Sequence, residues 1–192
     1  MSPARTLDPG VSRRLLDAAE RLFYDRGVQA AGIDAVVAEA GVATKTLYAH
    51  FGSKDGLVEA YLRRRDQRWL DWLRGAVATA PPGPQRVLAV FDALAEWFAE
   101  PGYNGCAFIN VAGELANNPT ARAVARDHKA ALRGLLREVA AGAGVNEPAV
   151  LADWLMLLAE GAIVTAHVEG DAGAAMRGRS AAAALLTLDQ TH

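Results

Sequence analysis

Apolar residues recur at helical spacing along most of the chain, and glycine and proline interrupt the recurrence. Ser12 is the expected cap of a first helix, in which Leu15, Ala19 and Leu22 lie on one face before Gly27 ends the pattern. Applied to the whole chain, the same criteria predict about nine helices and no convincing strand. We therefore expect an all-α fold.

Three further helices are predicted in the first half of the chain. A short one spans residues 33–40 and ends at Gly41, where a left-handed residue is wanted. Another short one spans roughly residues 44–50 and is broken by the glycine at 52. Ser53 then caps a longer helix that reaches about residue 80.

The second half contains further start and stop signals. Pro84, at the end of the PPGP stretch, suits the first turn of a new helix, and GYNG at 102–105 is another break. Asn118-Pro119 and Asn146-Glu147-Pro148 are cap-then-proline helix starts, and Asp171 can cap a last helix that ends near Leu188.

Composition limits the classes of protein that remain. Hydrophobic residues make up 52% of the 192 positions, which excludes a disordered polymer. The apolar run from Val150 to Val168 is interrupted by Asp153 and Glu160, so it predicts a buried helix and no membrane partner. An N-terminus without an apolar signal and a single cysteine, Cys106, agree with a cytoplasmic location.

Charge is nearly balanced along the chain. Residues 1–79 carry 12 Lys and Arg against 10 Asp and Glu, and residues 80–192 carry 8 against 12. A polyanion would therefore have to be bound by placed groups and not by bulk charge. The histidines at 50, 128, 167 and 192 are scattered, and we find no metal-ligand spacing or phosphate loop, so we expect no metal and no cofactor.

The two short helices, preceded by a longer one, match the helix-turn-helix pattern, whose second helix enters the DNA major groove. Leu47 and Phe51 are four residues apart and would form its buried side. Thr44, Lys45 and Tyr48 would then face DNA together with Ala49.

Side-chain chemistry suits this orientation. Lys45 can donate to guanine or to phosphate, and Thr44 can hydrogen-bond a base or contact a thymine methyl. Thr46, Tyr48 and His50 can reach phosphate oxygens, while Lys54 lies in the first turn of the next helix, where its charge and backbone N–H groups could hold one phosphate.

Residues 15–62 resemble the N-terminal domain of the TetR family of transcriptional regulators. The matching elements are the AAERLF run, Gly27, the AEAGV turn, the TLY core and the F-x-SK-x-x-L entry to the fourth helix. The resemblance implies a helix-turn-helix domain over 1–54, a connecting helix over about 53–80, and a helical regulatory and dimerisation domain over 80–192. It implies DNA contacts from Thr44, Lys45, Thr46, Tyr48, His50 and Lys54.

The chain departs from the family pattern at two helix caps. Gly32 stands where the family has a capping Thr or Ser, and Ala43 stands where it has Ser. Loss of a capping hydroxyl costs on the order of 1 kcal/mol, and less when glycine replaces it. We therefore retain Gly32 only as a possible backbone contact and expect no DNA contact from Ala43.

The resemblance also implies a ligand pocket and a homodimer. Aromatic-lined cavities are common small-molecule sites, and the candidate ligand-binding residues are Trp97, Phe98, Tyr103, Phe108, His128, Trp154, Leu158 and His167. The candidate interface residues, in the last two helices, are Gly161, Ala162, Thr165, Ala181 and Leu185. An ordinary intrachain core is the alternative for both sets.

Two other features favour simpler interpretations. The run Arg63–Arg65 fans around a helix and predicts a solvated face, with a minor prospect of a DNA contact. Cys106 has no basic neighbour in sequence, which favours a small buried residue over an oxidant sensor.

The sequence therefore predicts a transcriptional regulator and not an enzyme. Its expected form is a homodimeric repressor that an unknown small molecule releases from a palindromic double-stranded DNA operator. A helical interaction module that does not bind DNA is the main alternative, and a small enzyme is a more remote one.

Overall fold

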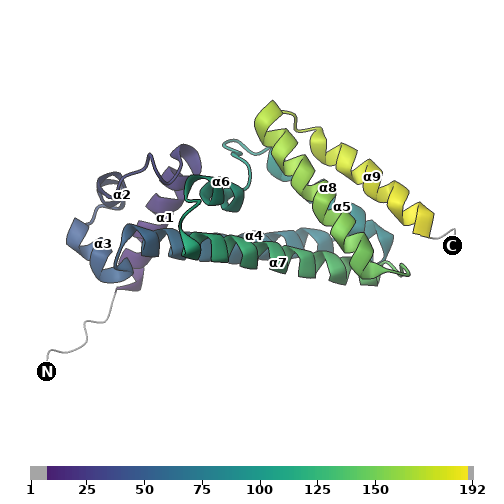
Figure 1. Cartoon of the computed structure of the whole chain (residues 1–192), viewed down its shortest axis with the longest axis horizontal. Helices are drawn as coiled ribbons and strands as arrows, with labels where there is room; N and C mark the ends of the chain where they lie inside the picture. The colour runs from purple at the N-terminus through teal and green to yellow at the C-terminus, as the bar shows by residue number, and fades with distance from the viewer. Residues whose placement is uncertain (1–7, 190–192) are drawn as a thin grey trace, which may run out of the picture. The chain divides into compact units, whose positions relative to one another are not determined.

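A computed structural model describes residues 8–189, which form nine α-helices and no strand (Figure 1). The all-α prediction is confirmed. The helices are α1 (Pro9–Arg26), α2 (Ile33–Ala40), α3 (Thr44–Phe51), α4 (Lys54–Ala78), α5 (Pro84–Phe98), α6 (Ala107–Glu114), α7 (Pro119–Gly142), α8 (Pro148–Glu169) and α9 (Ala174–Asp189).

The chain divides into two compact units. The first comprises the segment up to Arg65 together with Ala107–Ala125, and the second comprises Asp66–Cys106 together with the segment from Arg126 onward. Helices α4 and α7 each contribute residues to both units. The placement of α6 in the first unit is a property of the fold that helix periodicity does not indicate.

Helix α1 starts earlier than its periodicity suggested. Asp8 is the N-cap, its Oδ1 accepts a hydrogen bond of 2.8 Å from the Gly10 N–H, and Pro9 occupies the first turn. The prediction that Ser12 is the cap is wrong. Asp-Pro is the same cap-then-proline signal that correctly places the start of α7, where Asn118 Oδ1 accepts from the Ala121 N–H.

The corner between α2 and α3 follows the predicted boundaries closely. Gly41 ends α2 with φ 64° and ψ 41°, the left-handed conformation that glycine adopts without steric cost. Leu47 of α3 is fully buried, as is Val36 of α2. Phe51 is only half-buried, so Leu47 is the principal apolar anchor of α3.

The predicted solvated arginine run is wrong for two of its three members. Arg63 is exposed and pairs with Glu59 one turn away. Arg64 instead reaches both Asp17 (2.7 Å) and Glu20 (2.6 Å) on α1, and its side chain is only 22% exposed. Arg65 bonds Glu20 and lies 3.9 Å above the Tyr24 ring, a cation–π contact. These two arginines connect α4 to α1 within the first unit.

In the second unit, α9 packs against both α5 and α8 (Figure 1). The approach to α5 is close at Gly178, where an added Cβ would lie 2.8 Å from the Phe91 ring. Phe91 is fully buried, so its ring has little freedom to move. Gly178 is therefore required because a larger side chain would collide with the Phe91 ring, and not because of its backbone conformation.

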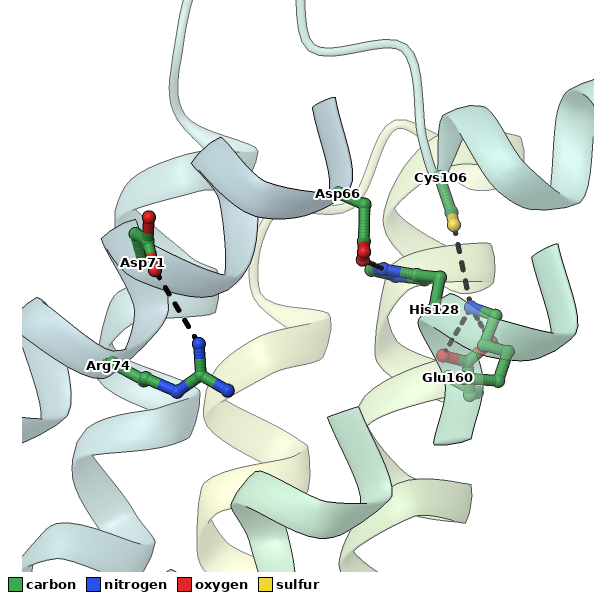
Figure 2. Close-up of polar contacts among 7 residues, drawn as sticks. Asp66, Asp71, Arg74, Cys106, His128 and Glu160 are labelled. Atoms are coloured by element: carbon green, nitrogen blue, oxygen red, sulfur yellow. Dashed lines mark hydrogen bonds and ion pairs between the residues drawn. The ribbon is translucent and has the colours of Figure 1, made fainter. Parts of the chain in front are cut away.

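Charged side chains of α7 pair with other helices of the second unit. His128 is buried, and its Nδ1 lies 2.7 Å from Asp66 Oδ1 of α4 (Figure 2). Lys129 Nζ donates to Glu160 of α8 at 2.7 Å and lies 3.5 Å from Cys106 Sγ. Cys106 is buried, as expected, but it has a basic neighbour that sequence spacing did not reveal.

Helix α8 has two apolar faces. Its inner face is buried through residues such as Leu155, Ala159 and Ile163, while Asp153 and Glu160 form ion pairs with α7. Its outer face leaves Leu157 72% and Val168 74% exposed. The prediction of a buried helix is therefore correct for one face only.

Length and composition alone would let α8 cross a membrane, and it is the one such helix among the described residues. Of the qualifying window, 44% is buried inside the protein. A core helix meets the same criterion, so this finding carries little weight.

Candidate nucleic-acid interface

Helix α3 presents its polar side chains outward from a buried base. Thr44, Lys45 and Ala49 are exposed, and Tyr48 is 47% exposed despite its large ring. Leu47, on the opposite side of the helix, has no exposed surface. Side chains three and four apart share a helix face, so the alternation of burial follows directly from the spacing.

The polar groups on this surface are unused within the protein. The side chains of these residues, Thr44, Lys45, Tyr48 and Lys54, make no hydrogen bond or ion pair to any described residue. Other cations of the first unit are engaged: Arg21 pairs with Glu39, and Arg14 donates to the Ala40 carbonyl at the end of α2. The donors around α3 are therefore available to a ligand.

The remaining predicted DNA contacts are less exposed. Thr46, His50 and Lys54 are half-buried, and the His50 ring lies 6.0 Å from that of Phe51. Lys54 is the first residue of α4, directly after Ser53, whose Oγ accepts from the Gly56 N–H at 3.0 Å. This hydrogen bond confirms the predicted cap.

Both helices of the corner lack a side-chain cap. Gly32 is the N-cap of α2 and Ala43 is the N-cap of α3, and neither supplies a side-chain acceptor. Both residues are exposed. First-turn N–H groups without a capping side chain remain available to solvent or to an anion.

This arrangement suits the major groove of B-DNA. The groove is about 12 Å wide and admits one helix, with the N-terminal residues of that helix nearest the base edges. Thr44 and Lys45 are the first two residues of α3 and lie on the exposed side. Tyr48 lies one turn further along, where a hydroxyl can reach the phosphate backbone.

Only some of the predicted ligand residues lie close together. Trp97, Phe98 and Tyr103 contact one another, with ring centroids 5.0 to 5.9 Å apart. Trp69 joins this aromatic cluster, 5.6 Å from Trp97 and 5.4 Å from His128. Trp69 was not predicted as a ligand residue, although the WLDWL repeat of aromatics on α4 was a visible signal.

Other predicted ligand residues lie elsewhere. Trp154 is 47% exposed on the outer face of α8, so its place in a pocket stays a prediction. Leu158 is half-buried on the same helix, and Phe108 is buried in the first unit. His167 is exposed, although its ring lies 6.5 Å from Tyr103.

The predicted interface residues differ in how much surface they expose. Gly161 is exposed, and Thr165, Ala181 and Leu185 are half-buried, so all four present some surface. Ala162 is 6% exposed and packs inside the chain, so its methyl group offers almost nothing to another subunit. A role for Ala162 in an interface stays a prediction.

Candidate metal-ligand side chains do not cluster in the described part of the chain. No group of three or more His, Cys, Asp or Glu side chains is placed to hold an ion there. Of the four histidines, His192 lies outside the described residues.

Comparison with known proteins identifies the first unit. Residues 15–61 match the family model for bacterial regulatory proteins of the tetR family. The chain is also 40% identical over 81 residues to the HTH-type transcriptional activator FasR of Mycolicibacterium smegmatis. That match covers 42% of this chain but only 37% of FasR.

Solved structures extend the likeness to the whole chain. A TetR-family transcriptional regulator from Streptomyces coelicolor superposes with a TM-score of 0.85 at 28% identity, covering 95% of this chain and 97% of that one. A protein from Streptomyces avermitilis assigned to the same regulators has a TM-score of 0.80 and 30% identity, covering 95% and 99%.

The comparisons agree with the geometry of α3. The family model spans the complete helix-turn-helix, and the exposed donors lie on the helix that reads DNA in this motif. The protein is a DNA-binding transcriptional regulator and a member of the TetR family.

Proposed function

We propose that the protein is a homodimer that represses transcription from a palindromic operator and leaves it when a small molecule binds. The observation that carries this proposal is the outward face of α3, where Thr44, Lys45 and Tyr48 hold unused donors above the buried Leu47. Lys45 and Thr44 read bases, while Tyr48, Thr46, His50 and Lys54 hold phosphates.

The outer face of α8 supports a homodimer. Trp154, Leu157, Gly161, Val164 and Val168 are all exposed, and their spacing alternates between three and four residues. This is the spacing with which two helices pack along an apolar seam. A contiguous apolar stripe of this kind is a sign of a protein interface, and a second copy supplies an identical stripe.

Dimerisation in turn supports a palindromic operator. One recognition helix contacts only a few base pairs, too few to select one site in a genome. A two-fold dimer doubles the contacts and reads two inverted half-sites, one helical turn or a multiple of it apart. The half-buried Thr165, Ala181 and Leu185 lie at the border of the proposed interface.

The aromatic cluster is the proposed effector site. Trp97 and Phe98 are buried, whereas Tyr103 is half-buried and its hydroxyl donates to the Ile163 carbonyl of α8. A ligand that displaces this bond would act directly on the helix that carries the proposed interface. We propose His128 and His167 as its polar neighbours.

Repression is proposed for the following reason. If an effector releases the protein, the ligand-free protein occupies the operator, and a protein bound there can block transcription. FasR is named an activator, so the direction of regulation needs its own test. DNA as the partner supports a cytoplasmic location for the protein. We assign it no catalytic activity and no cofactor.

Selection of bound sites from a random duplex library tests DNA binding, symmetry and half-site spacing together. We expect an inverted repeat, and we expect Lys45→Ala to alter the selected bases. Arg26→Ala is the matched control, because Arg26 is an exposed cation at the far end of α1. Recovery of no enriched sequence at low salt would favour a helical module that does not bind DNA.

A transcription assay with the selected operator then tests the direction. Repression predicts less transcript when the protein is added and recovery when an effector is supplied. More transcript on addition of the protein would make it an activator.

A further inference from the structure

A cavity lies within the second unit. It has a volume of about 210 Å³ and is lined by the last turns of α4 and α7 and by the α4–α5 loop with the start of α5. At about 30 Å³ for each water molecule, it has room for about seven waters or a small organic molecule. Trp69, Trp97, Phe98 and Tyr103 do not line it.

The floor of this cavity is apolar. Val77 of α4 and Leu135 and Val139 of α7 line it, and all three are at least nine-tenths buried. Leu135 and Val139 are four residues apart and therefore lie on one face of α7. A buried aliphatic floor favours the hydrocarbon part of a ligand over a strongly hydrated ion.

The lining also contains three charged side chains. Arg74 and Glu138 are exposed, while Arg86 is half-buried. Arg86 Nε donates to the Ala80 carbonyl at 3.2 Å, which anchors the guanidinium and leaves both Nη groups without a partner in the described chain. An anchored guanidinium with spare donors is suited to bidentate recognition of a carboxylate.

Arg74 is weakly engaged. Its Nη1 lies 3.5 Å from Asp71 Oδ1, and both side chains are more than half exposed (Figure 2). An exposed pair at this distance contributes little and can exchange for a ligand. Glu138 has no hydrogen bond or ion pair to a described residue. The three charged side chains therefore leave the cavity with one net positive charge.

We propose that this cavity binds a small aliphatic or aromatic monocarboxylate, a second ligand site separate from the aromatic cluster. The carboxylate pairs with Arg86 and Arg74, and its hydrocarbon part lies on Val77, Leu135 and Val139. One negative charge on the ligand neutralises the net charge of the lining. Glu138 opposes binding through repulsion and restricts the site to ligands that carry a single carboxylate.

Titration of the full-length protein with hexanoate, without DNA, tests this assignment. NMR of the methyl groups locates the site, because the resonances of Val77, Leu135 and Val139 should shift together. Hexanol has the same hydrocarbon part without the charge and should bind at least about tenfold more weakly, since hydrogen bonds to charged groups contribute most of the difference.

Three variants test how each charged side chain contributes to hexanoate binding. Arg86→Gln should weaken hexanoate binding by about tenfold or more, whereas Glu138→Gln should strengthen it several-fold. Arg137→Gln is the matched control, because Arg137 is an exposed arginine beside Glu138 that does not line the cavity. It removes the same formal charge and should leave the affinity nearly unchanged.

A fourth variant fills the space. Ala78→Phe adds bulk at an exposed lining residue and should block hexanoate while leaving the thermal melting midpoint unchanged. The proposal is overturned if hexanol binds as tightly as hexanoate, if Arg137→Gln weakens binding as much as Arg86→Gln, or if hexanoate shifts resonances only around Trp97. Because no DNA is present, these results are independent of operator binding.

Discussion

Helix α3 and helix α8 each present one face to solvent, and the two faces differ in chemistry. On α3, exposed Thr44, Lys45 and Tyr48 surround a buried Leu47, so the helix is polar outside and apolar inside. On α8, the outer face is as apolar as the inner one, with Leu157 72% and Val168 74% exposed. The first face is fully hydrated in the free protein, whereas the second leaves hydrocarbon in water.

This difference indicates two kinds of partner. Hydrated donors can exchange water for the phosphate and base acceptors of DNA, and contacts to phosphate release counterions, so the complex is sensitive to salt. An apolar stripe gains free energy whenever it is covered, about 25 cal/mol for each Å² removed from water. We therefore expect contacts made by α8 to be long-lived and contacts made by α3 to be reversible.

The largest predicted effect is that of Leu157→Glu. Leu157 is exposed in the single chain, so the protomer should fold normally, but the dimer would bury an uncompensated carboxylate from each subunit. We expect a loss of about 3–5 kcal/mol in dimer stability and, with it, loss of operator binding. Sedimentation measures dimer stability, and fluorescence anisotropy measures operator binding.

Ala130→Glu is the control for this prediction. Ala130 is exposed on α7, and the substitution introduces the same charge outside the apolar stripe of α8. If Leu157→Glu leaves the protein dimeric, the outer face of α8 is not the interface.

Lys45→Ala should have the next largest effect, and it should be confined to DNA recognition. Loss of a base contact costs about 1–3 kcal/mol and relaxes base preference at one position of each half-site. Dimerisation should be unaffected, since the Lys45 side chain is exposed and makes no hydrogen bond or ion pair to a described residue. Anisotropy on a panel of single-base operator variants measures the change; unchanged affinity and preference would remove Lys45 from the reading surface.

Lys54→Ala should weaken binding to all sequences about equally. If Lys54 holds one phosphate in each subunit, the slope of log affinity against log salt should become less steep by about two units for the dimer. Titrations at several salt concentrations measure this slope. A change in base preference with an unchanged slope would contradict the role proposed for Lys54.

The smallest predicted effect is that of Asp171→Asn, just before α9. The Arg177 guanidinium, followed by the Gly173 N–H, lowers the pKa of Asp171 below its ordinary value of 3.8. A lowered pKa means that the carboxylate stabilises the fold above pH 3.8 and that this contribution is lost as the pH falls through the folded-state pKa.

The variant should therefore melt slightly below the wild type at neutral pH and converge with it in acid. The group is exposed, so the difference at neutral pH should be small and should diminish with added salt. Thermal melts across the acidic range measure the difference in melting midpoint between the two proteins. A difference that widened as the pH fell would contradict this prediction.

Much of the helix-turn-helix was predictable because its signals are local. Gly41, the buried Leu47 and the exposed Lys45 follow from periodicity and from the left-handed preference of glycine. The cap of α1 was missed although Asp8-Pro9 is a local signal of the same kind. The periodic apolar face begins only at Leu15, so it does not mark the first turn of α1.

The second unit was less predictable because its contacts join distant segments. Trp154 and Trp97 are both aromatic residues on apolar helices, yet one is exposed and the other buried. Arg64 and Arg65 form part of an apparently solvated run, but carboxylates more than 40 residues away hold them against α1. Periodicity identifies a face of a helix and does not identify what covers it.

The sequence by itself determined where the helices lie, that a helix-turn-helix is present, and which side of α3 points outward. Only the tertiary structure decided that the outer face of α8 stays uncovered, that Trp154 lies on it, and that Arg74, Arg86 and Glu138 surround one cavity. The physical reason is range: caps and helix faces depend on neighbours within one or two turns, whereas burial and cavities depend on packing between segments far apart in the chain.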